Sequence, residues 1–155
     1  MGDFFISGAG DIDGDGKPEV IGGAPGALNS TGEVFIWFGS DLQTQSEPLP
    51  RIRLQGDISG SSFGRHVMIA DINGDGYDDV IVGAPTLKSD NQIAAGGLYV
   101  FLGQEGFKNW LPIMSAEQAD FSTIGDRSGL NTGQWINAAD FDDNGADDLL
   151  LFYRD

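Results

Sequence analysis

The chain has 155 residues, of which 24 are acidic and 8 are basic, so its formal net charge is −16 at pH 7. This charge argues against binding to nucleic acid or to an anionic membrane, since both are bound through basic surfaces. The absence of cysteine excludes disulfides and thiolate metal sites, and a single histidine argues against a multi-histidine metal site.

Short segments rich in β-branched and aromatic residues, many of them bounded by glycine, predict an all-β chain. Twenty-four glycines point to frequent tight turns. No segment has helical periodicity with caps, although 115–120 could form one short turn. No run reaches 18 apolar residues, so we expect no membrane insertion. In chain order, strands are expected at 34–38, near 49–54, at 65–70, 79–84 and 98–102, and near 110–114.

The segment 34–38 is apolar on both faces. Val34, Ile36 and Phe38 alternate with Phe35 and Trp37. A strand that is apolar on both sides is typical of the interior of packed sheets. We therefore expect burial of this strand from both sides.

Three acidic runs divide the chain into repeats. They begin 60 and then 69 residues apart, and read DIDGDGKPE at 11–19, DINGDGYDD at 71–79 and DFDDNGADD at 140–148. The flanking sequences repeat as well, since VIGGAP follows the first run and VIVGAP the second. The chain therefore holds about two and a half units, with approximate bounds 1–56, 57–125 and 126–155.

Each acidic run carries oxygen-bearing side chains at positions 1, 3, 5 and 9 and a glycine at position 6. Alternate side chains of a curled loop can converge on one point, and glycine permits the positive φ that the turn requires. The backbone carbonyl at position 7 can complete the shell. The predicted ligands are Asp11, Asp13, Asp15, Lys17 and Glu19 in the first run, Asp71, Asn73, Asp75, Tyr77 and Asp79 in the second, and Asp140, Asp142, Asn144, Ala146 and Asp148 in the third, with Lys17, Tyr77 and Ala146 contributing backbone carbonyls.

An all-oxygen ligand set selects a hard cation, and five or more oxygens in a flexible loop favour Ca²⁺ over Mg²⁺. We expect up to three calcium ions, with the first loop binding most tightly because its side chains carry a charge of −4 against −3 in the others. The alternative is a set of metal-free solvated turns, which three runs with one spacing disfavour. The runs are not EF-hands, because position 12 is Gly22, Val82 or Leu151 instead of glutamate.

The second unit resembles the FG-GAP repeats of the integrin α-subunit β-propeller and its bacterial relatives. Phe63-Gly64 and Gly83-Ala84-Pro85 stand on either side of the 71–79 loop. The first unit has no Phe-Gly pair in register, and the third has Thr132-Gly133 in its place. The resemblance implies four-stranded antiparallel propeller-type blades, with the calcium loop joining the first two strands. About two and a half units cannot close a ring alone, so the chain would be a piece of a longer propeller, would assemble with copies of itself, or would form a short open stack. The first two are favoured, because an uncovered blade face and sheet edge promote aggregation.

Three other features of the sequence have simpler interpretations. Asp57-x-Ser59-x-Ser61 resembles a metal-ion-dependent adhesion motif but is expected to be an inter-blade turn. His66 is interpreted as a packed or rim residue. The tryptophans Trp37, Trp110 and Trp135 are expected in the core, with stacking on sugars as the alternative.

The pattern as a whole predicts a calcium-binding integrin-like propeller module with a binding, adhesion or scaffold role and structural Ca²⁺. No nucleophile–base pair is evident, so we expect no catalysis. The ligand would be a protein or a glycan, and weak acidic loops fill only at extracellular calcium levels, which favours an extracellular or cell-surface location. The first residues do not form a signal peptide, so export would require a removed leader. The alternatives are the non-catalytic propeller portion of a secreted polysaccharide- or lipid-degrading enzyme, and a lectin.

Overall fold

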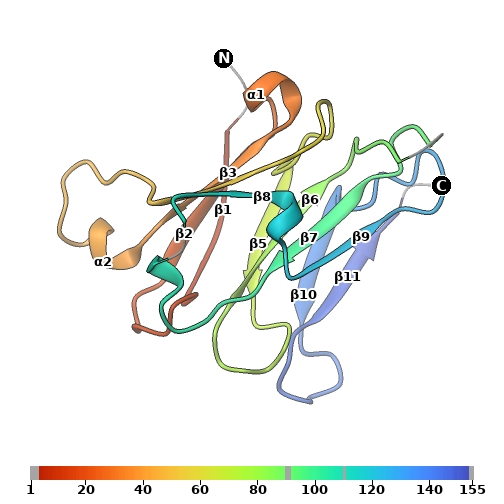
Figure 1. The fold of residues 1–155 in the computed structure, drawn as a ribbon. Helices are drawn as coiled ribbons and strands as arrows, with labels where there is room; N and C mark the ends of the chain where they lie inside the picture. The colour runs from red at the N-terminus through yellow and green to blue at the C-terminus, as the bar shows by residue number, and fades with distance from the viewer. Residues whose placement is uncertain (1–3, 90–91, 110, 154–155) are drawn as a thin grey trace.

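The computed structural model describes residues 4–89, 92–109 and 111–153. Its strands form three sheets that pack face to face (Figure 1). We call these sheets blades. Blade 1 contains β1 (Phe5–Gly10), β2 (Glu19–Ala24), β3 (Glu33–Trp37) and β4 (Ile52–Gln55), blade 2 contains β5 (His66–Ala70), β6 (Asp79–Ala84), β7 (Gly97–Phe101) and β9 (Phe121–Ile124), and blade 3 contains β10 (Trp135–Ala139) and β11 (Asp148–Phe152).

Within each blade the neighbouring strands are antiparallel and follow chain order. The all-β prediction and the partial propeller architecture are confirmed. The strands expected at 34–38, 49–54, 65–70, 79–84 and 98–102 are β3 to β7, each within a few residues of its expected bounds.

The predicted fourth strand of the second unit, near 110–114, is wrong. That place in blade 2 belongs to β9, and residues 113–115 instead form β8 (Ile113–Ser115), which pairs in parallel with β4 of blade 1. The apolar signal that drew the prediction is real, because Met114 is buried beside Leu54. All four residues of β9 are exposed, so this strand pairs with β7 through its backbone and adds no buried side chain to the core. Residue 110 lies outside the described residues.

The helical segments are short. They are α1 (Ala27–Ser30), α2 (Gly39–Leu42), η1 (Phe107–Asn109) and η2 (Ala116–Gln118). In α1, Leu28 and Asn29 have φ of 51° and 59°, so it is a left-handed turn. The predicted turn at 115–120 is confirmed as η2, which Ser115 and Gln118 close with a capping box. In the described part of the chain, no helix is long and apolar enough to cross a membrane.

Blade 2 is covered on both sides, and every residue of β6 is buried. Val80 and Val82 belong to an apolar core shared with blade 1, whereas Ile81 belongs to the core shared with blade 3. The two-sided burial expected for β3 holds on one face only: Val34 and Ile36 are fully buried, but Phe35 and Trp37 on the other face are half-buried. Among the described residues, no sheet packs on that face of blade 1.

Candidate metal centre

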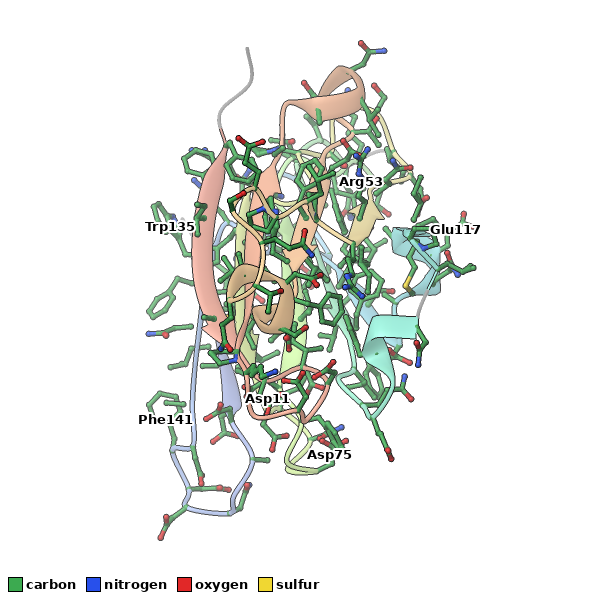
Figure 2. The ribbon with its side chains drawn as sticks, turned by 90° about the vertical axis from the view of Figure 1, so that its left-hand side faces the viewer. Asp11, Arg53, Asp75, Glu117, Trp135 and Phe141 are labelled. Carbon is green, nitrogen blue, oxygen red and sulfur yellow. The ribbon has the colours of Figure 1, made fainter. Side chains whose placement is uncertain are left out.

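The three acidic runs occupy equivalent places in the three blades. We call them loop 1 (11–19), loop 2 (71–79) and loop 3 (140–148). Each joins the first two strands of its blade, so all three lie at the same end of the molecule. Figure 2 shows Asp11 of loop 1 and Asp75 of loop 2 both at this end, the lower one in that view.

Each loop is curled by hydrogen bonds that follow the same numbering. The carboxylate at position 1 accepts a bond of 2.9 Å from the backbone N–H of the glycine at position 6. The side chain at position 5 accepts from the N–H at position 7. The glycines at position 6 have left-handed φ values of 76°, 88° and 89°, which other residues adopt only with strain. These glycines are Gly16, Gly76 and Gly145.

Loop 1 brings three carboxylates together. Asp11, Asp13 and Asp15 each place an oxygen within 4.8 Å of the others. Asp13 is only 5% exposed, and Oδ1 of Asp11 is buried with no hydrogen-bond partner among the described residues. Carboxylates held this close repel one another, and a buried oxygen without a partner is costly. A hard cation would relieve both penalties, so the donor set fits Ca²⁺.

Loop 3 repeats the cluster at a more exposed place, where Asp140, Asp142 and Asp148 lie within 4.8 Å of one another. In loop 2, Asp71, Asn73 and Asp75 are bonded within the loop: Nδ2 of Asn73 donates to Oδ2 of Asp75 at 3.0 Å, and Oδ1 of Asp71 accepts from Gly74 N at 2.7 Å. Ligation by the carbonyls of Lys17, Tyr77 and Ala146 stays a prediction.

The carboxylates at position 9 have a structural role that the sequence analysis missed. Glu19 is fully buried and accepts hydrogen bonds from Ile12 N at 2.9 Å and from Gly39 N at 3.2 Å. Asp79 accepts equivalently from Ile72 N and Gly103 N. Each thus ties its loop to the end of the third strand. The repeated glycines that follow 34–38 and 98–102 in the sequence were the available signal.

The buried position-9 groups also titrate abnormally. Burial raises the pKa of Glu19 to about 7, and nearby Asp13 and Asp15 add to the rise, while the hydrogen bonds from Gly39 and Ile12 oppose it. Burial likewise raises the pKa of Asp79 to about 6. A bound cation would favour the ionised carboxylates.

The Asp57-x-Ser59-x-Ser61 motif forms an inter-blade turn, as expected. The hydroxyls of Ser59 and Ser61 donate to backbone carbonyls of Asn29 and Thr31 in the first unit, at 3.2 and 3.0 Å. Asp57 accepts from Glu117 N at 2.8 Å. These side chains are therefore engaged with the backbone of other segments.

His66 is half-buried and bonded to the backbone of Gln134, the residue before β10 of blade 3, as expected for a packed residue. The core prediction for Trp135 is wrong. The residue is 60% exposed and does not belong to the apolar core that blades 2 and 3 share, to which the neighbouring Ile136 contributes. Trp37 is half-buried, and Trp110 lies outside the described residues.

Residues 6–37 and 63–101 match the FG-GAP repeat family. The first segment ends with β3 and the second begins at Phe63 and ends with β7, so loops 1 and 2 lie inside the matches. Loop 3 lies outside them.

The chain is also similar in sequence to parts of several curated proteins. It is 30% identical over 149 residues to phosphatidylinositol-glycan-specific phospholipase D of Mus musculus, covering 91% of this chain and 17% of the relative. It is 37% identical over 86 residues to integrin alpha-7 of Homo sapiens, covering 56% of this chain and 7% of the relative. It is 37% identical over 102 residues to integrin alpha-IIb of Mus musculus, covering 63% of this chain and 9% of the relative. The chain thus spans less than a fifth of the length of these relatives.

Proposed function

The chain is a partial propeller of integrin-like FG-GAP repeats, and from this premise we propose that it is a calcium-binding module with a binding, adhesion or scaffold role. The ions would be held by the side chains at positions 1, 3, 5 and 9 and the carbonyl at position 7 of each loop. When bound, Ca²⁺ supplies positive charge and fixes the loop between the first two strands of a blade. Binding energy would then appear as folding energy.

The observation that supports this proposal most strongly is the carboxylate cluster of loop 1. Three aspartates share one small space there, and Oδ1 of Asp11 is buried without a hydrogen-bond partner among the described residues. The second support is repetition, since the same curl and the same ligand spacing occur at equivalent places in three blades.

Thermal unfolding with and without Ca²⁺ tests the proposal. A ligand that binds only the folded state stabilises it by about 2.7 kcal/mol at one hundred times its Kd. We therefore expect Tm to rise with calcium concentration and to fall when EGTA is added in low salt. Mg²⁺ at the same concentration serves as the control and should have a smaller effect. A Tm that is the same in EGTA and in millimolar Ca²⁺ would refute the structural role.

The partner and location follow as parts of the same proposal. Acidic loops of modest affinity fill at millimolar Ca²⁺, which favours an extracellular or cell-surface protein. A protein or glycan ligand would bind through surface loops, and no catalytic role is proposed for the chain. Either a parent chain or further copies would complete the ring. The mass in solution, measured in calcium by light scattering, separates a stable monomer from a self-assembled ring.

A second candidate is favoured by the phospholipase D relative, whose match covers 91% of this chain. The chain would then be the non-catalytic propeller portion of a secreted lipid-degrading enzyme, and a polysaccharide-degrading parent is the related alternative. The natural full-length protein would hydrolyse phosphatidylinositol glycans, and residues 1–155 alone would not.

The remaining alternative is a lectin, which requires sugar binding. A glycan array probed with residues 1–155 tests it.

A further inference from the structure

Backbone hydrogen bonds join loop 2 to loop 1 and loop 3 to loop 2. The backbone N–H at position 8 of loop 2, from Asp78, donates to the carbonyl of Asp11 in loop 1 at 3.0 Å. The equivalent N–H of Asp147 in loop 3 donates to the carbonyl of Asp71 in loop 2 at 2.7 Å. In both cases the acceptor is the position-1 aspartate whose side chain curls its own loop. In loop 1, position 8 is Pro18, which has no N–H to donate.

Asp78 also makes a side-chain bond to loop 1, and Asp147, its counterpart in loop 3, makes no equivalent bond to loop 2 among the described residues. Oδ2 of Asp78 accepts from Asp11 N at 2.7 Å, so Asp78 holds both backbone groups of Asp11. The carboxylate occupies space that exists only because residue 10 is glycine: a Cβ on Gly10 would lie 2.5 Å from Oδ2 of Asp78. Among the described residues, Asp147 makes only the backbone half of this connection.

The loops are also in van der Waals contact at neighbouring positions. The ring of Tyr77, at position 7 of loop 2, lies over Gly14 at position 4 of loop 1, where a Cβ would be 2.5 Å from Cε1. Ala146 of loop 3 is placed in the same way near Gly74 of loop 2, although at a looser 3.4 Å. The contact between loops 1 and 2 is therefore the tighter of the two.

We propose that Ca²⁺ binding at loop 2 raises the Ca²⁺ affinity of loop 1, with Asp78 as the positioning residue that couples them. The inference rests on the proposed function. Asp78 lies between Tyr77 and Asp79, two of the predicted ligands of loop 2, so an ion there fixes its backbone and side chain. Through both bonds to Asp11, that order is transmitted to the residue that curls loop 1. Loop 1 then loses part of its conformational entropy before its own ion binds, so binding of that ion has a smaller entropic cost.

The sign of the coupling distinguishes this contact from simple electrostatics. An ion in loop 2 neutralises carboxylates that would otherwise attract a second ion to loop 1, so Coulomb interaction alone predicts weaker binding at loop 1. At 0.15 M salt the Debye length is about 8 Å, which reduces this opposing effect. Positive coupling at that salt concentration therefore requires a structural connection.

Calorimetric titration with Ca²⁺ in 0.15 M salt tests the coupling in the full chain. Asp140→Ala removes loop 3 and leaves loops 1 and 2, and Asp140→Ala combined with Asp71→Ala leaves loop 1 alone. We expect loop 1 to bind at least about fivefold more tightly when loop 2 is intact, as is typical of coupled sites. Adding Asp78→Ala to both proteins removes the side-chain bond to Asp11 N and keeps the backbone bond, so the ratio should fall toward one. Asp78→Asn keeps an acceptor for Asp11 N and should preserve the ratio.

A matched control comes from loop 3. In a protein with Asp11→Ala, Asp147→Ala should leave the affinities of loops 2 and 3 unchanged, because no side-chain bond joins them in the described residues. If Asp78→Ala does not fold, the affinity of loop 1 is still compared between Asp140→Ala and Asp140→Ala/Asp71→Ala, with and without Asp78→Asn. That comparison decides between coupled and independent loops. Independent binding at both loops would overturn the coupling and leave the proposed function intact. Absence of any Ca²⁺ binding would overturn the proposed function itself.

Discussion

Gly83 of blade 2 and Gly133 of blade 3 are packed so closely that a Cβ built on Gly83 would lie 1.9 Å from the carbonyl oxygen of Gly133. The same relationship joins blades 1 and 2, where a Cβ on Gly23 would lie 1.9 Å from the carbonyl oxygen of Gly64. The first residue of each Gly-Ala-Pro is thus packed against the backbone of a glycine that lies two residues before the first strand of the next blade. This contact gives a physical reason for the glycine that ends Phe-Gly and for the glycine that begins Gly-Ala-Pro.

Gly83→Ala should therefore separate blades 2 and 3. The neighbouring atoms belong to backbone and cannot rotate away, so we expect a loss of about 3 kcal/mol or more in the free energy of unfolding, at the upper end of overpacking effects. Urea unfolding of both proteins measures it. Gly129→Ala is the control, because Gly129 has φ of 80° and open space around its Cα, so only backbone strain of about 1–2 kcal/mol is expected. Equal losses for the two variants would contradict the packing explanation.

Thr132→Val should stabilise the protein. Thr132 stands where the second unit has Phe63, it is 3% exposed, and its hydroxyl has no hydrogen-bond partner among the described residues. Replacing a buried unpaired hydroxyl by a methyl group of the same shape should raise the free energy of unfolding by about 1 kcal/mol. Urea unfolding measures the change. Thr123→Val, at an exposed position of β9, should change stability by less than about 0.5 kcal/mol. Destabilisation by Thr132→Val would show that the hydroxyl is bonded, for example to water.

The stability should depend on pH through His66. Burial lowers the pKa of His66 below its ordinary 6.5, although a hydrogen bond to the backbone of Gln134 opposes the shift. The unfolded chain therefore takes up a proton at a higher pH than the folded protein does. Stability is fully present above about pH 6.5 and decreases as pH falls from there toward the folded-state pKa.

His66→Gln should flatten this part of the pH profile. The acidic loops titrate in both proteins, so the difference between the two profiles isolates the histidine. Chemical unfolding at several pH values, at constant Ca²⁺, measures it. Parallel profiles between pH 5 and pH 7 would show that His66 titrates alike in the folded and unfolded states.

The loops should differ in affinity, with loop 1 the tightest. Its four side chains carry a charge of −4 when all are ionised, as a bound cation favours, and Asp13 is nearly buried, whereas the cluster of loop 3 is mostly exposed. Calcium-induced stabilisation should therefore fall most in Asp11→Ala and less in Asp71→Ala and Asp140→Ala. Calorimetry and the calcium dependence of Tm measure the ranking. Asp143→Asn, at an exposed non-ligand position of loop 3, is the control and should bind like the wild type. Equal or reversed losses would disprove the ranking.

The sequence alone determined the features that depend on neighbouring residues. The spacing of oxygens in the loops, the glycine at position 6 and the apolar runs of β5 and β6 act within a few residues. Each of them was therefore visible in the chain and recurs in the structure at the expected place.

Only the tertiary structure decided which distant groups meet. β8 pairs with blade 1 although its residues lie in the second unit, because Met114 finds a buried place beside Leu54 there. Asp78 and Asp11 bond across 67 positions, and nothing local marks either as the other's partner. The partial burial of Phe35 and the exposure of Trp135 likewise depend on which sheet covers each face, and an apolar pattern cannot specify that. A local pattern fixes which side of a strand is apolar, whereas the packing of whole blades fixes what that side touches.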